Sequence, residues 1–115
     1  MSAKSLNVRV RHQAGVAIID LQGDINAKAE EALTTAYTDA TATNPSAILL
    51  NLENVKYITS VGITLLVRLV AQAHEANRRL AACGLNNHYH EVFQITRLTD
   101  FIEIFPDEAG ALSKL

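Results

Sequence analysis

The chain has 115 residues, of which 49% are hydrophobic and 19% are charged, and its formal net charge is −2 at pH 7. This length predicts one domain spanning residues 1–115, with enough apolar side chains to form a core. The small negative charge gives no electrostatic reason to expect nucleic acid or an anionic membrane as a partner. No signal peptide or membrane-spanning run is evident, so we expect a cytoplasmic protein.

Two strands are predicted at the N-terminus. Residues 6–11 alternate apolar and polar side chains, which is typical of an edge strand with one face in water. A tight turn at 12–15 leads into an apolar run at 16–21, which we expect to pair with the first strand as a hairpin and to end at Gly23 and Asp24.

An amphipathic helix follows this hairpin. Asn26 is a suitable N-cap, and apolar residues recur at helical spacing up to Ala40 before Asn44 and Pro45 end the pattern. The run at 47–50 is apolar without alternation, as expected for a central parallel strand. Polar residues dominate 51–56, which we expect to form a loop in water.

A second helix is predicted from Val61 to about Ala76. Its tightest apolar stripe is formed by Leu66, Leu69, Val70 and Ala73. Further apolar residues broaden that stripe beyond one face of the helix, namely Val61, Ile63, Leu65 and Val67. A helix of this kind is either buried on two sides or binds a partner.

The C-terminal part alternates strand and helix. The prediction is a strand at 78–83 closed by Gly84, a helix at 88–97, a strand at 101–105 and a short helix at 107–115. The inward-facing candidates of the helix at 88–97 are Val92, Phe93, Ile95 and Thr96. A hairpin followed by alternating helix and strand predicts an α/β fold with a mostly parallel sheet. A flavodoxin-like fold is the alternative, although that fold normally opens strand–helix.

Ser60 is the residue most suited to chemistry, and two interpretations of it stay open. As a hydroxyl at a helix start, Ser60 can be an N-cap or a phosphorylation site, and one residue can be both. A helix N-terminus favours the negative charge of a phosphate. The nucleophile-elbow pattern is absent, since Ile58 stands in place of its first glycine.

Metal and phosphate-loop chemistry have no support in the sequence. His88 and His90 lie two apart on a predicted helix and point to nearly opposite sides, so they cannot share an ion. Glycine-rich phosphate loops are missing, and Cys83, the only cysteine, is read as a small buried residue that excludes an internal disulfide. We therefore expect no catalytic residue, no metal and no cofactor.

The segment from Tyr57 to Leu66 resembles the signature of STAS domains, in particular the bacterial anti-sigma factor antagonists. On that pattern Ser60 stands at the phospho-acceptor serine and Gly62 at the glycine, while Thr59 stands where the family has Asp. Residues 21–26 resemble the family's Gly-acidic-Leu-Asp segment, with an Asn at position 26 where Asp is common. Residues 79–105 resemble the family's C-terminal half, so the resemblance spans nearly the whole chain.

The resemblance implies a STAS-like fold and a non-enzymatic regulatory binding module. Its partner would be an anti-sigma factor or a serine kinase-fold protein, and phosphorylation of Ser60, preferred over Thr59, would turn binding off. The implied partner-binding residues are Asn26, Thr59, Ser60, Val61, Gly62 and Ile63. The alternative function is a constitutive STAS docking subunit of a larger assembly, either a stress-signalling complex or a lipid-transporter ATPase. Both functions leave a homodimer open.

Overall fold

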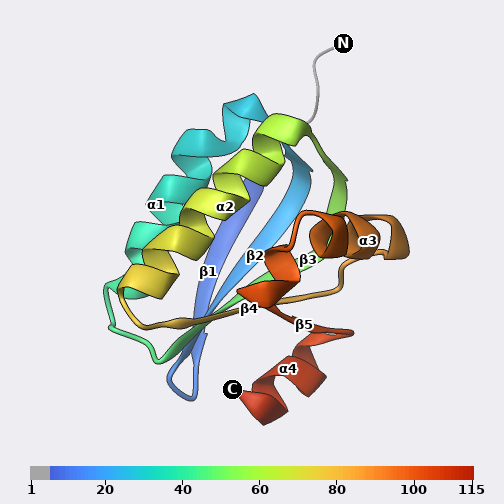
Figure 1. Ribbon diagram of the computed structural model, residues 1–115. Coiled ribbons are helices and arrows are strands. Elements are labelled where there is room, and N and C mark those ends of the chain that lie inside the picture. The colour runs from blue at the N-terminus through green and yellow to red at the C-terminus, as the bar shows by residue number, and fades with distance from the viewer. Residues whose placement is uncertain (1–5) are drawn as a thin grey trace.

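The computed structural model describes residues 6–115 as a five-stranded sheet with helices on both faces (Figure 1). The strands are β1 (Asn7–Gln13), β2 (Val16–Ile25), β3 (Ala47–Ile58), β4 (Arg79–Cys83) and β5 (Glu103–Phe105). The helices are α1 (Glu30–Thr41), α2 (Ser60–Glu75), α3 (Asn87–Ile95) and α4 (Glu108–Lys114), with 3₁₀ turns η1 (Ala27–Ala29) and η2 (Leu98–Asp100). Within these residues, no helix is both long and apolar enough to cross a membrane.

The strands lie in the order β1-β2-β3-β4-β5, and only the β1–β2 pair is antiparallel. The hairpin turn has positive φ at Ala14 and Gly15, as two-residue hairpin turns of the favoured kind require. The run predicted as a central strand lies in β3, the middle strand of the sheet. The predicted α/β fold, a hairpin edge on a mostly parallel sheet, is confirmed, and the flavodoxin-like alternative is excluded by the antiparallel opening.

The predicted loop at 51–56 is wrong, because β3 continues to Ile58 and β2 continues beyond Gly23 to Ile25. The pairing of these strands shifts register between Asp20 and Gln22 and again between Gly23 and Asp24, where β3 carries one residue more than β2 each time. The buried residues of this part of β3 are Leu52, Val55 and Ile58, separated by pairs of exposed residues. Two β-bulges therefore replace the period-2 alternation that identifies a strand in a sequence.

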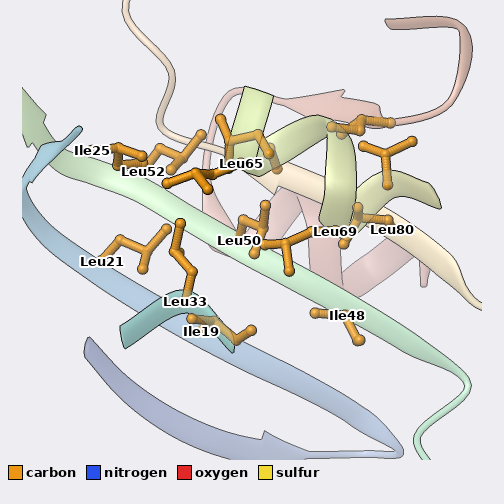
Figure 2. Packing of buried hydrophobic residues seen from close by; sticks show 14 of the residues in the cluster. Ile19, Leu21, Ile25, Leu33, Ile48, Leu50, Leu52, Leu65, Leu69 and Leu80 are labelled. Carbon is orange, nitrogen blue, oxygen red and sulfur yellow. The ribbon is translucent and has the colours of Figure 1, made fainter. Parts of the chain in front are cut away.

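Helices α1 and α2 lie side by side on one face of the sheet and bury its main core (Figure 1). Figure 2 shows Ile19 and Leu21 of β2, Ile48 and Leu50 of β3, Leu33 of α1, and Leu65 and Leu69 of α2 converging there. Leu66 and Leu69 are 1% and 3% exposed, so their predicted burial is confirmed. A second cluster on the other face, which includes Ile18 and Leu49, packs against α4.

Three details of the C-terminal prediction are wrong. Helix α3 covers Asn87–Ile95, and its end leaves Ile95 80% exposed, while Thr96 is exposed as well. Strand β5 begins only at Glu103, and Phe101 lies before it, largely exposed. The Phe101 ring packs in a T-shaped arrangement with the His74 ring, with 6.0 Å between centroids. The inward side of α3 is formed by Phe93, as predicted, and by Tyr89, which was not predicted, while Val92 is partly buried against the core.

Candidate functional site

Helix α2 begins one residue earlier than the interpretation of Ser60 as its N-cap requires. Thr59 has extended backbone angles (φ −78°, ψ 171°), and its Oγ1 accepts a hydrogen bond from the Gly62 N–H at 3.1 Å. Thr59 is therefore the N-cap, and the N-cap prediction for Ser60 is wrong. The cause lies in β3, which holds the backbone extended up to Ile58 and makes Thr59 the first residue outside the strand.

The orphan amides of this helix start are only partly satisfied. A helix leaves its first four N–H groups without an intrahelical partner. The Thr59 N–H donates to the Ile25 carbonyl at 3.0 Å, and the Gly62 N–H donates to the cap. Among residues 6–115, nothing accepts a hydrogen bond from the N–H of Ser60 or Val61, and the exposed Ser60 hydroxyl also has no partner. Within the described part of the chain, a hydroxyl without a partner thus lies beside two amides without partners.

The end of β2 brings Asn26 to the same place. Asn26 caps η1, as predicted for a helix start here, by accepting a hydrogen bond from the Lys28 N–H at 3.0 Å. The preceding residue, Ile25, pairs with Ile58 of β3 and receives the Thr59 N–H. A Cβ added to Gly62 would lie 2.1 Å from the Ile25 carbonyl oxygen, so only glycine permits this approach. The structure therefore groups Asn26, Thr59, Ser60 and Gly62.

The remaining predicted binding residues differ in accessibility. Val61 is 48% exposed, Ile63 is half-buried, and Gly62 is buried, so Gly62 shapes the site rather than offering surface to a partner. Tyr57 is 64% exposed. It lies on β3 two residues before the cap and adds an aromatic group that sequence analysis missed. The second bulge turns it outward, and no sequence pattern signals that bulge.

Sequence analysis also missed Tyr89 of α3. The Ile58 N–H donates a buried hydrogen bond to the Tyr89 hydroxyl at 2.9 Å. This bond fixes the backbone immediately before Thr59. A tyrosine two residues inside a predicted helix carries no signal for such a contact, since its partner lies 31 positions away in the chain.

The ionisable groups of the described residues give no support for a metal site. In the part of the chain that the structure describes, no three His, Cys, Asp or Glu side chains gather to hold an ion, and this includes His88 and His90. Burial raises the pKa of the Cys83 thiol to about 11, which leaves it protonated at neutral pH. On the far face of the sheet, the Arg11 guanidinium bridges Asp20 (2.6 Å) and Glu108 (2.6 Å) and ties α4 to β1 and β2.

Comparisons with known proteins agree with this architecture. The STAS domain family model matches residues 7–111. The anti-sigma F factor antagonist of Paenibacillus polymyxa is 21% identical over 112 residues, which cover 96% of each chain. The crystal structure of an anti-sigma factor antagonist from Mycobacterium paratuberculosis superimposes with a TM-score of 0.82 at 21% identity, covering 96% of this chain and 93% of that one. The structure of Bacillus SpoIIAA in its phosphorylated form superimposes with a TM-score of 0.72 at 17% identity, covering 94% of this chain and 98% of that one.

Proposed function

This chain belongs to the STAS domain family, and we propose that it is a regulatory binding module of the anti-sigma factor antagonist type. Its partner is an anti-sigma factor or a serine kinase-fold protein, and it docks at the start of α2 and the neighbouring Asn26 turn. Phosphorylation of Ser60 switches this binding off. The names of the similar proteins support the class, and SpoIIAA, which shares the fold, is described in a phosphorylated form.

The observation that carries the proposal is the environment of the Ser60 hydroxyl. It is exposed, and no group within residues 6–115 bonds to it. It lies at the first residue of a 16-residue helix, beside the Val61 amide, which likewise has no partner in this range. A phosphate adds about −1.5 to −2 charges at pH 7. Unpaired amides and the aligned peptide dipoles at a helix N-terminus both favour such a charge. The free protein therefore accepts the modification with little cost.

A bound partner responds differently to the same charge. The surface around Ser60 includes the exposed apolar side chains of Tyr57 and Val61. A partner that covers these groups also removes water from Ser60. An unpaired charge buried in that contact costs several kcal/mol, so one modification separates the free and bound states.

The module has no catalytic role in this proposal. Within residues 6–115 no histidine is hydrogen-bonded to Ser60, and the hydroxyl of the adjacent Thr59 caps the helix. Purified protein should hydrolyse neither nucleotides nor esters. Reproducible turnover that disappears in Ser60→Ala would show that the protein is an enzyme.

A permanent docking subunit is the second candidate, and the apolar exposure of the site favours it. Tyr57, Val61 and Val67 are all exposed, and Thr59 supplies no carboxylate beside Ser60. In such a subunit the same surface stays covered in a larger assembly, and Ser60 is never modified.

Titration of the two Ser60 variants separates these candidates. The partner is first captured from the native cell, identified by mass spectrometry, and then titrated with wild type, Ser60→Asp and Ser60→Ala. We expect Ser60→Asp to bind about a hundredfold more weakly or worse, because several kcal/mol are lost. Ser60→Ala should bind like wild type.

The control for added charge is Thr35→Asp, at an exposed position in α1 away from the site. It should bind normally, and melting curves should show that all variants are folded. Wild-type affinity of Ser60→Asp, together with unmodified Ser60 in cell extracts, would reject the switch and favour the docking subunit.

A further inference from the structure

Strand β3 extends well beyond its neighbour β4. The two strands pair from Ala47 opposite Arg79 to Asn51 opposite Cys83, where β4 ends. From Leu52 to Ile58, β3 pairs with β2 alone. A strand with one open edge has backbone groups that need other partners or water. At Ile58, the last residue of the strand, that partner is a side chain.

The Tyr89 hydroxyl takes the place of the missing strand. It accepts the Ile58 N–H at 2.9 Å in a buried position. The backbone of Tyr89 is fixed as well, because the Tyr89 N–H donates to Oδ1 of Asn86, the N-cap of α3, at 2.9 Å. The His88 and Tyr89 rings also pack against each other in a T-shaped arrangement, with 4.7 Å between centroids. The hydroxyl is therefore held by a capped helix and a packed ring.

The position of Ile58 links this bond to the site. On one side Ile58 pairs with Ile25 of β2, and on the other it is held by Tyr89. The next residue is the cap Thr59, and the one after it is Ser60. A backbone fixed on both sides at Ile58 allows little freedom in the direction of the Ser60 side chain or of the amides beside it.

We propose that Tyr89 is a positioning residue for the Ser60 switch, holding the end of β3 so that the Ser60 side chain meets the free amides at the start of α2. This inference rests on the proposed function, and it extends the site from β3 and α2 to α3. The alternative is that Tyr89 only fills the core. Ring packing alone needs no hydroxyl, whereas the observed hydroxyl bonds to the backbone next to the switch.

A thiol placed at the acceptor position measures this positioning without a kinase or a partner. The Ser60→Cys variant puts an ionisable group at the helix start, and iodoacetamide alkylation across a pH series gives its pKa. An ordinary thiol has a pKa of about 8.5, and a helix N-terminus lowers it. Wild type is the blank, because its only thiol, Cys83, is buried. We expect the pKa of the introduced thiol to lie about one unit below the ordinary value.

Tyr89→Phe in the Ser60→Cys background removes only the hydroxyl. We expect it to raise the thiol pKa by about half a unit, which slows alkylation at pH 7 roughly threefold. The matched control is Tyr37→Phe, which removes a hydroxyl from another buried tyrosine, on α1. Neither change adds or removes a charge at neutral pH, so a shift reports the geometry around the thiol.

Each pattern of thiol pKa shifts either supports or overturns the role of Tyr89. A shift with Tyr89→Phe and none with Tyr37→Phe supports the inference. No shift with either variant overturns it, and equal shifts with both overturn it as well, since they reflect general loosening. An ordinary pKa in the parent Ser60→Cys variant overturns it too and also removes the support for phosphate at Ser60.

A second variant decides the matter if Tyr89→Phe does not fold. Asn86→Ala removes the exposed cap that orients Tyr89 and leaves the ring in place. It should raise the thiol pKa in the same direction, and an unchanged value would overturn the inference. The proposed function fails by a different measurement, when Ser60→Asp binds the partner as tightly as wild type, and that result leaves the thiol values as they are.

Discussion

Gly62 is the residue whose size matters most at the candidate site. A methyl group there would meet the backbone oxygen and carbon of Ile25 at 2.1 and 2.9 Å, and backbone cannot rotate away. Gly62→Ala should therefore destabilise the protein by about 1–3 kcal/mol through overpacking, even though Ala is the better helix former. Denaturant melts measure this free energy of unfolding.

Gly110 provides the comparison within the same chain. It also lies in a helix, α4, but a methyl group there would meet only the carboxylate oxygen of Asp107, at 3.1 Å. Gly110→Ala should be neutral or stabilise by up to about 1 kcal/mol. If both variants are as stable as wild type, α2 does not approach β2 as closely as described.

The cap of α2 gives a second prediction at this scale. Thr59→Ala should cost about 1 kcal/mol, because the Gly62 N–H loses its acceptor. Ser60→Ala should change stability by less than about 0.5 kcal/mol, because the Ser60 hydroxyl bonds to nothing in residues 6–115. Thr59→Asp keeps a capping oxygen and adds a charge that the helix start favours, so it should match wild type or exceed it. Thermal melts of the three variants rank them, and a larger loss for Ser60→Ala than for Thr59→Ala would contradict the assigned cap.

Helix α2 combines a buried side and an exposed apolar side. Leu66 and Leu69 are buried against the sheet, and their substitution by Ala should cost about 2–5 kcal/mol each. Val67, between them in sequence, is 45% exposed, and Val67→Ala should cost well under 1 kcal/mol. Urea melts of the three variants test this, and a loss near zero for either leucine would mean that α2 is rotated relative to the structure described.

The predictability of each element depended on whether its sequence pattern survived in the fold. The α2 pattern predicted helix and burial together because helical periodicity is regular over four turns. In β3 the strand was recognised only up to Leu50, because the bulges that follow break its alternation. The identity of the cap depended on where β3 ends. Thr59 and Ser60 are adjacent hydroxyl residues that both suit an N-cap, so the sequence alone could not decide between them. The bond from Ile58 to Tyr89 depends on tertiary packing and has no local pattern.

At the scale of the whole molecule, one ionic network joins residues far apart in the sequence. Arg11 pairs with both Asp20 and Glu108. The hydrogen bonds of Arg11, with a smaller contribution from Asn51, lower the pKa of Asp20. A carboxylate whose pKa is lower in the folded state stabilises above its unfolded pKa of about 4 and loses this contribution as the pH falls. We expect stability to decline below about pH 4 and to decline less steeply in Asp20→Asn. Melts from pH 6 to pH 2 compare the slopes.

A substitution of Arg11 tests whether its ion pair with Asp20 causes this acid response. Arg11→Gln removes the guanidinium that Asp20 and Glu108 share, so it should flatten the acid profile in the same way. Profiles as steep as that of wild type in both variants would show that other groups control the acid response.

The order of the sheet has a consequence for synthesis. Each strand from β1 to β5 lies next to the strand that precedes it in the chain, so every new strand can join an existing edge as it leaves the ribosome. The far face of the sheet is different, because Val16, Ile18 and Leu49 must wait for α4, which follows all five strands in the chain. A chain that has left the ribosome only as far as Asp107 therefore presents a sheet with this apolar face uncovered. Such an intermediate exposes apolar surface that is prone to aggregation, which is the kind of surface that chaperones protect.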